Sequence, residues 1–323
     1  MALLGIDLGG TKLAAAVFTD DGSMLHKTST YLEGRTGAEA GRLITEHIRR
    51  FVYPVEHVAQ EEIRAIGISV PGIYHQKTGT VWAPNIPGWE NYPLLQEVKS
   101  VTGGIPVAID SDRACYILGE YWQGNVQGCR DAIFLSVGTG IGAGILINGN
   151  VLRGAHDIAG AIGWLGLNKP FTEGYIPCGC FEYHASGDGI ARVARDLLKD
   201  ARGYQGILKQ KPSHEITAHD VFRALDQKDA IAAEVIRDCI AYWGMAVANL
   251  ISLFNPEKII LGGGVFGPAI RFIPDIQKEA EKWAQPLSVH QYTLEASALN
   301  GDAGVYGTGY LAWRSLNPVK TAS

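Results

Sequence analysis

The chain carries the glycine-rich stretch GIDLGGTK at residues 5–12 and a second one, SVGTGIGAG, at residues 136–144. Each stretch follows a short apolar run. Each is followed by another apolar run that ends in a turn signal, Asp-Gly at 21–22 or Asn-Gly at 148–149. The order strand, glycine turn, strand, tight turn therefore occurs twice. This repeat predicts a duplicated nucleotide-binding half-domain, with phosphates held between the copies.

Bulk composition narrows the class of protein. The chain has 323 residues, 46% of them hydrophobic and 19% charged, which is ordinary for a soluble enzyme of one large or two medium domains. Its net charge of −5 gives no electrostatic reason to expect nucleic acid. No apolar run reaches about 18 residues, and the N-terminus lacks a basic signal-like segment. The number of cysteines, five, is odd and low, which fits a reducing cytoplasm better than a disulfide scaffold. Taken together, these features lead us to expect a cytoplasmic protein without membrane or nucleic-acid partners.

Hydrophobic spacing alternates between strand-like and helix-like along both halves, which predicts an α/β fold with mixed sheets. In the first half we expect a three-strand meander over 1–30, a helix within 36–60, a strand at 63–70, an irregular loop over 73–95, a strand at 106–110 and a helix at 112–122. In the second half we expect a meander from 131, helices over 187–250, a strand at 258–261, a helix at 268–283, a strand at 292–296 and a helix at 303–313.

Tight glycine turns let backbone N–H groups approach an anion without a Cβ in the way. Hydroxyl and ammonium groups in these turns add to the attraction, and Asp7 ends its strand where a carboxylate could reach Mg²⁺ directly or through water. The alternative is that both stretches are only hairpin turns between core strands. Because there are two matched copies, we expect nucleotide phosphates at Gly9, Gly10, Thr11, Lys12, Gly138, Thr139 and Gly140.

Two stretches also fit the dinucleotide-binding pattern, namely residues 138–143 and residues 262–267. The first should open a helix, yet residues 144–149 have the character of a strand and a hairpin. The second follows a strand and precedes a helix, but no acidic residue ends a second strand about 20 positions later. A nicotinamide enzyme is therefore a minor alternative, and the P-loop pattern of four spacers before Gly-Lys-Ser/Thr is absent from the sequence.

Several motifs, taken in order, resemble the ROK family of bacterial sugar kinases and repressors, within the superfamily of sugar kinases, actin and heat-shock chaperones. The resemblance covers nearly the whole chain. It is carried by GIDLGGT at 5–11, VPG at 70–72, PNIPGW at 84–89, Asp112 with LGE at 118–120, GTGIG at 138–142, GCFE at 179–182 and NPEKIILGGG at 255–264.

The resemblance implies two ribonuclease-H-like (actin-like ATPase) domains with mixed sheets flanked by helices, and an active site in the cleft between them. We expect a small N-terminal domain of residues 1–118 plus 300–323 and a larger domain of residues 119–299. The family also implies ATP and Mg²⁺ as cofactors and a homodimer. ROK repressors carry an N-terminal helix-turn-helix for which this chain has no room, so the resemblance implies a kinase.

In that family Asp112 would be the general base that takes the proton from the attacking sugar hydroxyl, and it would also contact the sugar. Phosphoryl transfer needs such a carboxylate near the attacking oxygen, although Asp112 could instead be only a helix N-cap. Trp89 is expected to anchor its loop. The other residues that the resemblance implies are Pro71, Gly72, Asn85 and Glu182 for the sugar, and Gly262 and Gly263 beside the adenosine.

The chain departs from the family around Asp112, where Ser111 and Ala114 replace two asparagines of the family, and at two further motifs. The family's Gly-Glu-x-Gly-His, which supplies a sugar-binding Glu and a zinc-ligand His, is GAIGW at 160–164. The family's Cys-x-Cys-Gly-x-x-Gly-Cys zinc loop keeps only Cys178 and Cys180, with Glu173 and Tyr175 at the two upstream cysteine positions. We therefore expect no zinc.

The alternative is a rebuilt zinc site, because tetrahedral zinc needs about four ligands and Cys178, Cys180, His184 and His156 could supply them. Our hypothesis is that packing by Trp164 and Phe171 replaces the metal.

Loss of the Glu and the His should change specificity, because a hydrogen bond that a sugar hydroxyl fails to make is costly. In the family those groups lie towards carbons 1 and 2 of the sugar. We therefore expect weak activity on free glucose and a substituted or differently configured sugar as substrate. The functional prediction is an ATP- and Mg²⁺-dependent carbohydrate kinase; the alternative is a catalytically weak sugar-binding or sensing protein.

Overall fold

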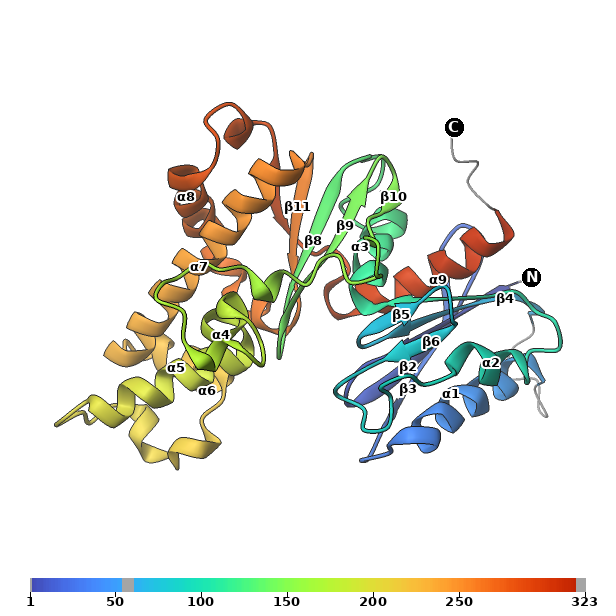
Figure 1. Cartoon of the computed structure of the whole chain (residues 1–323), viewed down its shortest axis with the longest axis horizontal. Coiled ribbons are helices and arrows are strands. Elements are labelled where there is room, and N and C mark those ends of the chain that lie inside the picture. The colour runs from blue at the N-terminus through green and yellow to red at the C-terminus, as the bar shows by residue number, and fades with distance from the viewer. Residues whose placement is uncertain (1, 54–60, 318–323) are drawn as a thin grey trace. The chain divides into compact units, whose positions relative to one another are not determined.

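The first glycine stretch forms the turn between two antiparallel strands, as the sequence predicts. These strands pair from Leu3↔Phe18 to Leu8↔Leu13, and a third strand completes the expected meander. Two further strands join the other edge in parallel, so the sheet is mixed and has the order β3-β2-β1-β4-β7. Figure 1 labels β2, β3 and β4 of this sheet. Its strands are β1 (Ala2–Leu8), β2 (Lys12–Phe18), β3 (Met24–Tyr31), β4 (Ile63–Val70) and β7 (Val107–Ser111).

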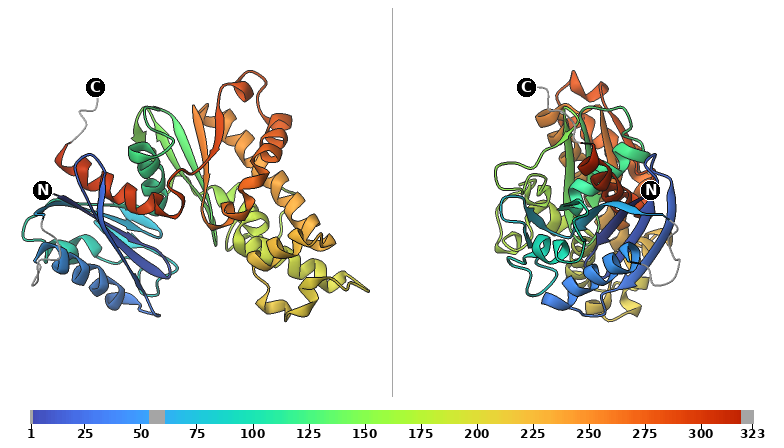
Figure 2. Two further views of the ribbon diagram at one scale, coloured as in Figure 1. Left: turned by 180° about the vertical axis from the view of Figure 1, so that it is seen from behind. Right: turned by 90° about the vertical axis from the view of Figure 1, so that its right-hand side faces the viewer.

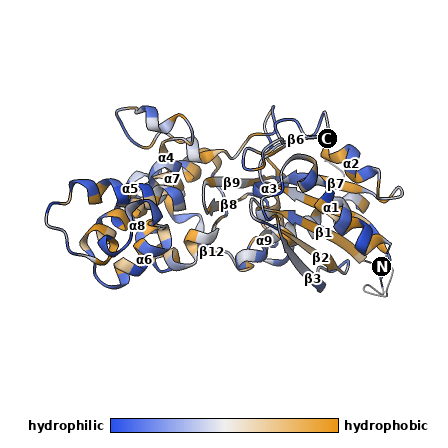
Figure 3. Cartoon of the chain, turned by 90° about the horizontal axis from the view of Figure 1, so that it is seen from below, coloured by the Kyte–Doolittle hydropathy of each residue, from blue (hydrophilic) through white to orange (hydrophobic). Residues whose placement is uncertain are grey.

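Both faces of this sheet are covered by helices because successive strand residues point to opposite faces. Leu4 and Ile6 pack with the helices on one face, whereas Leu3 and Phe18 pack against the opposite face. Figure 3 shows the apolar character of β1 and β2, and Figure 2 shows the helices on either side. The helices are α1 (Gly37–Val52) and α2 (Leu94–Lys99) on the first face and α3 (Asp112–Gln123) and α9 (Ala303–Leu316) on the second.

The stretch 73–95 differs from the expected irregular loop. It contains a two-stranded hairpin of β5 (Ile73–His75) and β6 (Thr80–Trp82), and an isolated bridge joins Val81 to Tyr92. Three-residue strands are too short for period-2 alternation to stand out in a sequence, which explains the wrong prediction. The expected helix over 36–60 is α1, and residues 54–60 of that range lie outside the described residues.

The second glycine stretch turns between β8 and β9, which pair from Ala132↔Leu146 to Val137↔Ile141. The sheet built on them is also mixed, and its order β10-β9-β8-β11-β12 matches the order of the first sheet strand for strand. The internal repeat predicted from the glycine turns is therefore present in the topology. The strands are β8 (Ala132–Val137), β9 (Ile141–Ile147), β10 (Asn150–Val151), β11 (Lys258–Gly262) and β12 (Thr293–Ala296).

Helices make up most of the remainder of the second half. The 25-residue α7 packs against α8 and against the shorter helices before it, and it ends at Asn255, whose left-handed backbone (φ 43) caps the helix. The expected helix at 268–283 begins with the 3₁₀ turn Pro268–Phe272 before α8 proper. The helices are α4 (Cys180–Ala185), α5 (Gly187–Asp200), α6 (Ala218–Asp226), α7 (Ala230–Phe254) and α8 (Ile273–Trp283).

The structure is a computed structural model that describes residues 2–53 and 61–317. It divides into a first unit of residues 1–128, 150–159 and 298–323 and a second unit of residues 129–149 and 160–297. The domain limits expected from the sequence, 1–118 plus 300–323 and 119–299, stay a prediction. The α/β class with mixed sheets is confirmed. None of the helices in the described ranges combines the length and apolar character needed to cross a membrane.

Candidate functional site

The glycine turn of the first unit lies beside the predicted sugar-binding asparagine. The N–H of Gly9 donates to the carbonyl of Lys12 at 2.9 Å, which closes the turn, and Gly10, Thr11 and Lys12 are exposed. A Cβ placed on Gly10 would lie 3.9 Å from the Cβ of Asn85. Two motifs that are far apart in the sequence therefore meet at one exposed point of this unit.

Asp7 is the penultimate residue of β1, just before this turn, so it lies one residue from the strand end where the sequence analysis places it. Desolvation by burial raises the pKa of its carboxyl, and the negative charge of Asp302 adds to the effect while Lys12 opposes it. A Cβ on Gly304 would collide with the Asp7 carboxylate, so only glycine leaves room for it in α9. A partly buried carboxylate is a suitable ligand for Mg²⁺, which needs one or two carboxylates and takes its other oxygens from water and phosphate. The residues present fit that ion.

Asp112 is the first residue of α3, directly after β7. The helix is capped by Ser111, whose Oγ accepts the N–H of Ala114 at 3.3 Å. Asp112 Oδ1 accepts the N–H of Arg113 at 2.8 Å. Desolvation by burial, to which the charge of Asp7 adds, raises the pKa of Asp112 to about 6. A carboxyl with such a pKa is ionised at neutral pH yet able to accept a proton, as a general base must be.

The other residues predicted for the sugar belong to the same unit. Pro71 and Gly72 follow β4, and a Cβ on Gly72 would collide with the carbonyl of Trp82, so the β5–β6 hairpin requires glycine there. Asn85 is exposed. Trp89 is fully buried and donates its Nε1–H to the carbonyl of Gly37 at 2.9 Å, which confirms its expected role as an anchor of the loop.

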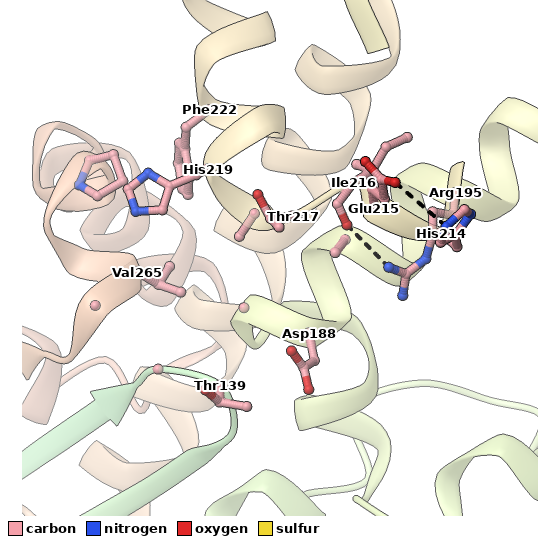
Figure 4. A pocket seen from close by; sticks show the side chains of 16 residues that line it. Thr139, Asp188, Arg195, His214, Glu215, Ile216, Thr217, His219, Phe222 and Val265 are labelled. Carbon is pink, nitrogen blue, oxygen red and sulfur yellow. Dashed lines mark hydrogen bonds and ion pairs between the residues drawn. The ribbon is translucent and has the colours of Figure 1, made fainter. Parts of the chain in front are cut away.

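The glycine turn of the second unit opens into a cavity of about 610 Å³ (Figure 4). The first residues of helix α5 bond to this turn. The N–H of Gly187 donates to the carbonyl of Gly138 at 2.8 Å, and the N–H of Asp188 donates to the carbonyl of Thr139 at 3.4 Å. Gly138 and Thr139 line the cavity, whereas Gly140 is not among its lining residues. A volume of this size suits a small organic ligand such as a nucleoside.

Gly264 and Val265 line the same cavity, while Gly262 and Gly263 do not. A Cβ on Gly262 would collide with the Phe134 ring, and one on Gly263, which has φ +89, would collide with the carbonyl of Val137. These two glycines let β11 and its turn pack closely on β8. A Cβ on Gly264 would meet nothing within 4 Å, so this residue leaves open space above the backbone.

Sequence reasoning missed most of this cavity's wall, which comes from α5 and from the segment before α6. Figure 4 shows Asp188 beside Thr139, and it shows the Arg195 side chain donating to the carbonyl of Ile216 at 3.1 Å. The one sequence signal was a capping box, Thr217 with Asp220, which marks the start of α6. The missed lining residues include Asp188, Arg195, His214, Glu215, Thr217, His219 and Phe222.

Glu182 belongs to α4 in the second unit. Its Oε2 accepts the N–H of Ile141, next to the glycine turn, at 2.6 Å. A Cβ on Gly140 would lie 2.6 Å from the same oxygen, and one on Gly163 would lie 3.0 Å from it. Desolvation by burial raises the pKa of the carboxyl. Glu182 is therefore half-buried between two glycines, with one oxygen tied to the backbone.

The residues around Glu182 do not fit zinc. No cluster of three His, Cys, Asp or Glu side chains suited to a metal occurs within residues 2–53 and 61–317. His184 instead bonds through Nε2 to the hydroxyl of Tyr175 at 2.9 Å and stacks on Tyr242, with ring centroids 4.7 Å apart.

The hypothesis that Trp164 and Phe171 replace the metal is wrong as stated. Their side chains are 56% and 71% exposed, and Phe171 makes only an edge contact with Tyr175. We call the group that does pack here the tyrosine–histidine cluster: Tyr175, Tyr183, His184 and Tyr242.

Comparisons with known proteins identify the family of the chain. The ROK family model matches residues 3–315. The chain is 34% identical over 326 residues to a glucokinase of Halalkalibacterium halodurans, covering 98% of this chain and 96% of the relative. It is 28% identical over 311 residues to a beta-glucoside kinase of Listeria monocytogenes, covering 96% and 97%. It is 30% identical over 315 residues to a xylose repressor of Caldicellulosiruptor bescii, covering 95% and 76%.

Solved structures give the same result. A ROK hexokinase from Thermus thermophilus matches with a TM-score of 0.80 at 28% identity, covering 99% of this chain and 100% of that one. A ROK family glucokinase from Streptomyces griseus, solved with glucose and AMPPNP, matches with a TM-score of 0.76 at 29% identity, covering 97% and 99%. The duplicated mixed sheets, each with a glycine turn between its first two strands, define an α/β protein with an internal repeat. The chain belongs to the ROK family.

Proposed function

We propose that this protein is an ATP- and Mg²⁺-dependent carbohydrate kinase with Asp112 as its general base. The observation that carries the proposal is the position of Asp112. Its helix is capped by Ser111, its pKa is raised to about 6, and its unit also contains the first glycine turn with Asn85 beside it. An alcohol that loses its proton to this carboxylate becomes the nucleophile for the γ-phosphorus.

The nucleotide in this proposal occupies the cavity of the second unit. Its phosphates extend over the backbone of Gly138 and Thr139, where a Cβ on Gly138 would meet nothing within 4 Å. Gly9, Gly10, Thr11 and Lys12 contact the phosphates from the first unit. Asp7 holds Mg²⁺ directly or through water. The ion, when bound, neutralises charge on the transferring phosphoryl group.

The acceptor in this proposal is a sugar held by Pro71, Gly72, Asn85 and Glu182. Ala161 and Trp164 provide neither a carboxylate nor an imidazole, so fewer polar groups fix the sugar hydroxyls. A pocket with fewer hydrogen-bonding demands tolerates a substituted or differently configured sugar better than one that must fix each hydroxyl. The beta-glucoside kinase relative supports such a substrate, and we expect free glucose to be a poor one.

The main competing function is a sugar-binding or sensing protein without turnover. Such a protein would have no use for Asp112 at a pKa of about 6 beside Asp7. Five free cysteines support a reducing, cytoplasmic location. The homodimer that the family implies remains part of the proposal.

A coupled assay of ADP release over a panel of free and substituted sugars, with ATP and Mg²⁺, tests the proposal. We expect turnover on at least one sugar, stronger than on free glucose, and its loss in Asp112→Asn. Calorimetric sugar binding without ADP release on any sugar would instead establish the sensor. Equal efficiency on free glucose and on the substituted sugars would refute the substrate class but leave the kinase assignment standing.

A further inference from the structure

The segment Asn150–Ala159 belongs to the first unit, although the residues on both sides of it belong to the second. Two side chains attach it there. Arg153 Nη2 donates to Asp110 Oδ2, and Asp157 Oδ2 accepts the N–H of Gln76 at 3.4 Å. The carbonyl of Arg153 also accepts the N–H of Ala159 at 3.0 Å, which closes the segment on itself. These contacts are an ion pair and two hydrogen bonds, and none of them involves Asp112 or Asp7.

Asp110 is the buried end of this attachment. It is the penultimate residue of β7 and is only 5% exposed. Its Oδ1 accepts the N–H of Ser111 at 2.9 Å, and its other oxygen meets Arg153, whose side chain is 26% exposed. One carboxylate thus joins the cap residue of α3 to the segment. Besides Arg153, the ionisable groups close enough to interact electrostatically with Asp110 include Tyr74, Asp157 and Cys115.

Arg153 supplies the positive charge that this buried carboxylate needs. A buried charge that loses its partner is strongly destabilising, because neither water nor a counter-ion replaces it. Asp110 without Arg153 would have to turn towards solvent or become neutral. Either change would release the N–H of Ser111 or weaken its acceptor, and Ser111 holds the first turn of α3.

We infer that the Arg153–Asp110 pair is a positioning element for Asp112, acting through Ser111 and the first turn of α3. The inference rests on the proposed kinase function. The same segment reaches the β5–β6 hairpin through Asp157 and Gln76, and that hairpin directly follows Pro71 and Gly72. The base and part of the predicted sugar site therefore share one anchor, which fixes the hydroxyl oxygen and the carboxylate relative to each other.

Three variants test the inference: Arg153→Met, Arg153→Lys and the double variant Asp110→Asn/Arg153→Met. Displacing reacting groups by about 1 Å can cost about 100-fold in rate, so Arg153→Met should lower kcat by about 10-fold or more, with the KM for ATP within about 2-fold of wild type. Arg153→Lys should recover most of the loss, since it restores the charge. The double variant leaves no unpaired charge and serves if Arg153→Met does not fold.

Hydrogen exchange of residues 111–115 gives a readout that does not depend on turnover. We expect faster exchange in Arg153→Met than in wild type, and near-normal exchange in Arg153→Lys. Unchanged exchange in Arg153→Met would overturn the inference, as would a kcat within 2-fold of wild type or a loss that Arg153→Lys fails to recover. A wild-type protein without turnover would refute the proposed function instead, and the exchange experiment would still decide the anchoring role.

Discussion

Ser111 caps helix α3, and Asp112 is the first residue inside it. The Oγ of Ser111 accepts the N–H of Ala114 at 3.3 Å, whereas Asp112 Oδ1 accepts the N–H of the adjacent Arg113 at 2.8 Å. The two interpretations of Asp112 that the sequence left open were a helix cap and a catalytic base. Because the neighbouring serine performs the capping, the interpretation of Asp112 as no more than a cap loses its support.

We expect Asp112→Asn to act mainly on activity and Ser111→Ala mainly on stability. Loss of a general base typically costs 10²- to 10⁴-fold in rate, so Asp112→Asn should lower kcat by about that factor. Loss of a serine cap costs about 1 kcal/mol of stability, so Ser111→Ala should lower the Tm; because Ser111 also holds the first turn that positions Asp112, kcat should fall by about 10-fold, well short of the loss in Asp112→Asn. Thermal unfolding and the coupled assay measure both. Equal losses of turnover in the two variants would contradict the separation of roles.

The raised pKa of Asp112 predicts a specific pH dependence. The base works when ionised, so kcat should fall as the pH drops through about 6. Ionisation in the folded state costs free energy, because the folded pKa lies above the ordinary value of 3.8. This cost is absent at pH below 3.8 and complete above about 6, where it reaches up to about 3 kcal/mol.

Asp112→Asn should therefore raise the free energy of unfolding at pH 8 and change it little at pH 4. Denaturant unfolding at the two pH values measures the difference. If Asp112→Asn is less stable than wild type at pH 8, the folded protein stabilises the ionised form of the Asp112 carboxylate, which would contradict its raised pKa.

Two glycines in the second unit form a matched pair for testing the nucleotide site. A Cβ on Gly138 meets nothing within 4 Å and would project into the space assigned to phosphate. Gly263 has a φ of +89, and a Cβ on it would collide with the carbonyl of Val137. We expect Gly138→Ala to raise the KM for ATP by about 10-fold or more, the equivalent of about one lost charge-assisted hydrogen bond, with little change in Tm.

Gly263→Ala should do the reverse, lowering the Tm through strain of about 1 kcal/mol or more. ATP titrations of both variants measure the KM for ATP, and thermal unfolding measures their Tm. If Gly138→Ala binds ATP as well as wild type does, the phosphates do not extend over this turn.

Much of this fold could be predicted from local signals. Strong apolar runs placed β4 at Ile63–Val70 without error, and the turn pairs after each glycine stretch located the two hairpins. The duplicated sheet order followed from the same repeat. The β5–β6 hairpin could not be found in this way, because its strand pairs and the collision that keeps Gly72 a glycine involve residues five to ten positions apart with no period of their own.

The site was less predictable than the fold. Residues that form a turn, such as Gly138, can be recognised in a sequence by their glycine pattern. Residues that line the cavity, such as Asp188 or His219, come from ordinary helical segments and become neighbours only through folding. The ion pair of Arg153 with Asp110 joins residues 43 positions apart and has no sequence pattern. Nor could exposure be judged for Trp164 and Phe171, since large aromatic side chains are usually buried and both are exposed here.

Glu182 can be tested without disturbing the turn to which it is bonded. Glutamine keeps an oxygen that can accept the N–H of Ile141 but carries no charge for a sugar hydroxyl. A hydrogen bond to a charged group contributes about 1.5–3 kcal/mol, so Glu182→Gln should raise the KM for the sugar by roughly 10- to 100-fold, with the KM for ATP nearly unchanged. Sugar and ATP titrations separate the two. A larger effect on ATP than on sugar would assign Glu182 to the turn rather than to the acceptor.

The tyrosine–histidine cluster predicts that the helix bearing Glu182 is held without a metal. Desolvation by burial, with Arg192 adding to it, lowers the pKa of His184. The imidazole is therefore neutral at pH 7 and can accept the Tyr175 hydroxyl through Nε2. Prolonged treatment with a strong zinc chelator, followed by dialysis and Mg²⁺, should leave the Tm and kcat unchanged.

Removing the hydroxyl in Tyr175→Phe should lower the free energy of unfolding by about 1 kcal/mol. The control variant is Phe171→Leu, which removes a neighbouring edge contact and should lower the free energy of unfolding less. The free energy of unfolding of the wild-type protein falls as the pH drops through 6.5 towards the lowered pKa of His184, because the unfolded chain then binds a proton on this histidine that the folded protein, whose Nε2 accepts the Tyr175 hydroxyl, resists. The Tyr175→Phe penalty should accordingly be larger at pH 8 than at pH 5. One equivalent of tightly bound zinc in the purified protein, with loss of Tm on its removal, would contradict this account of how α4 is held.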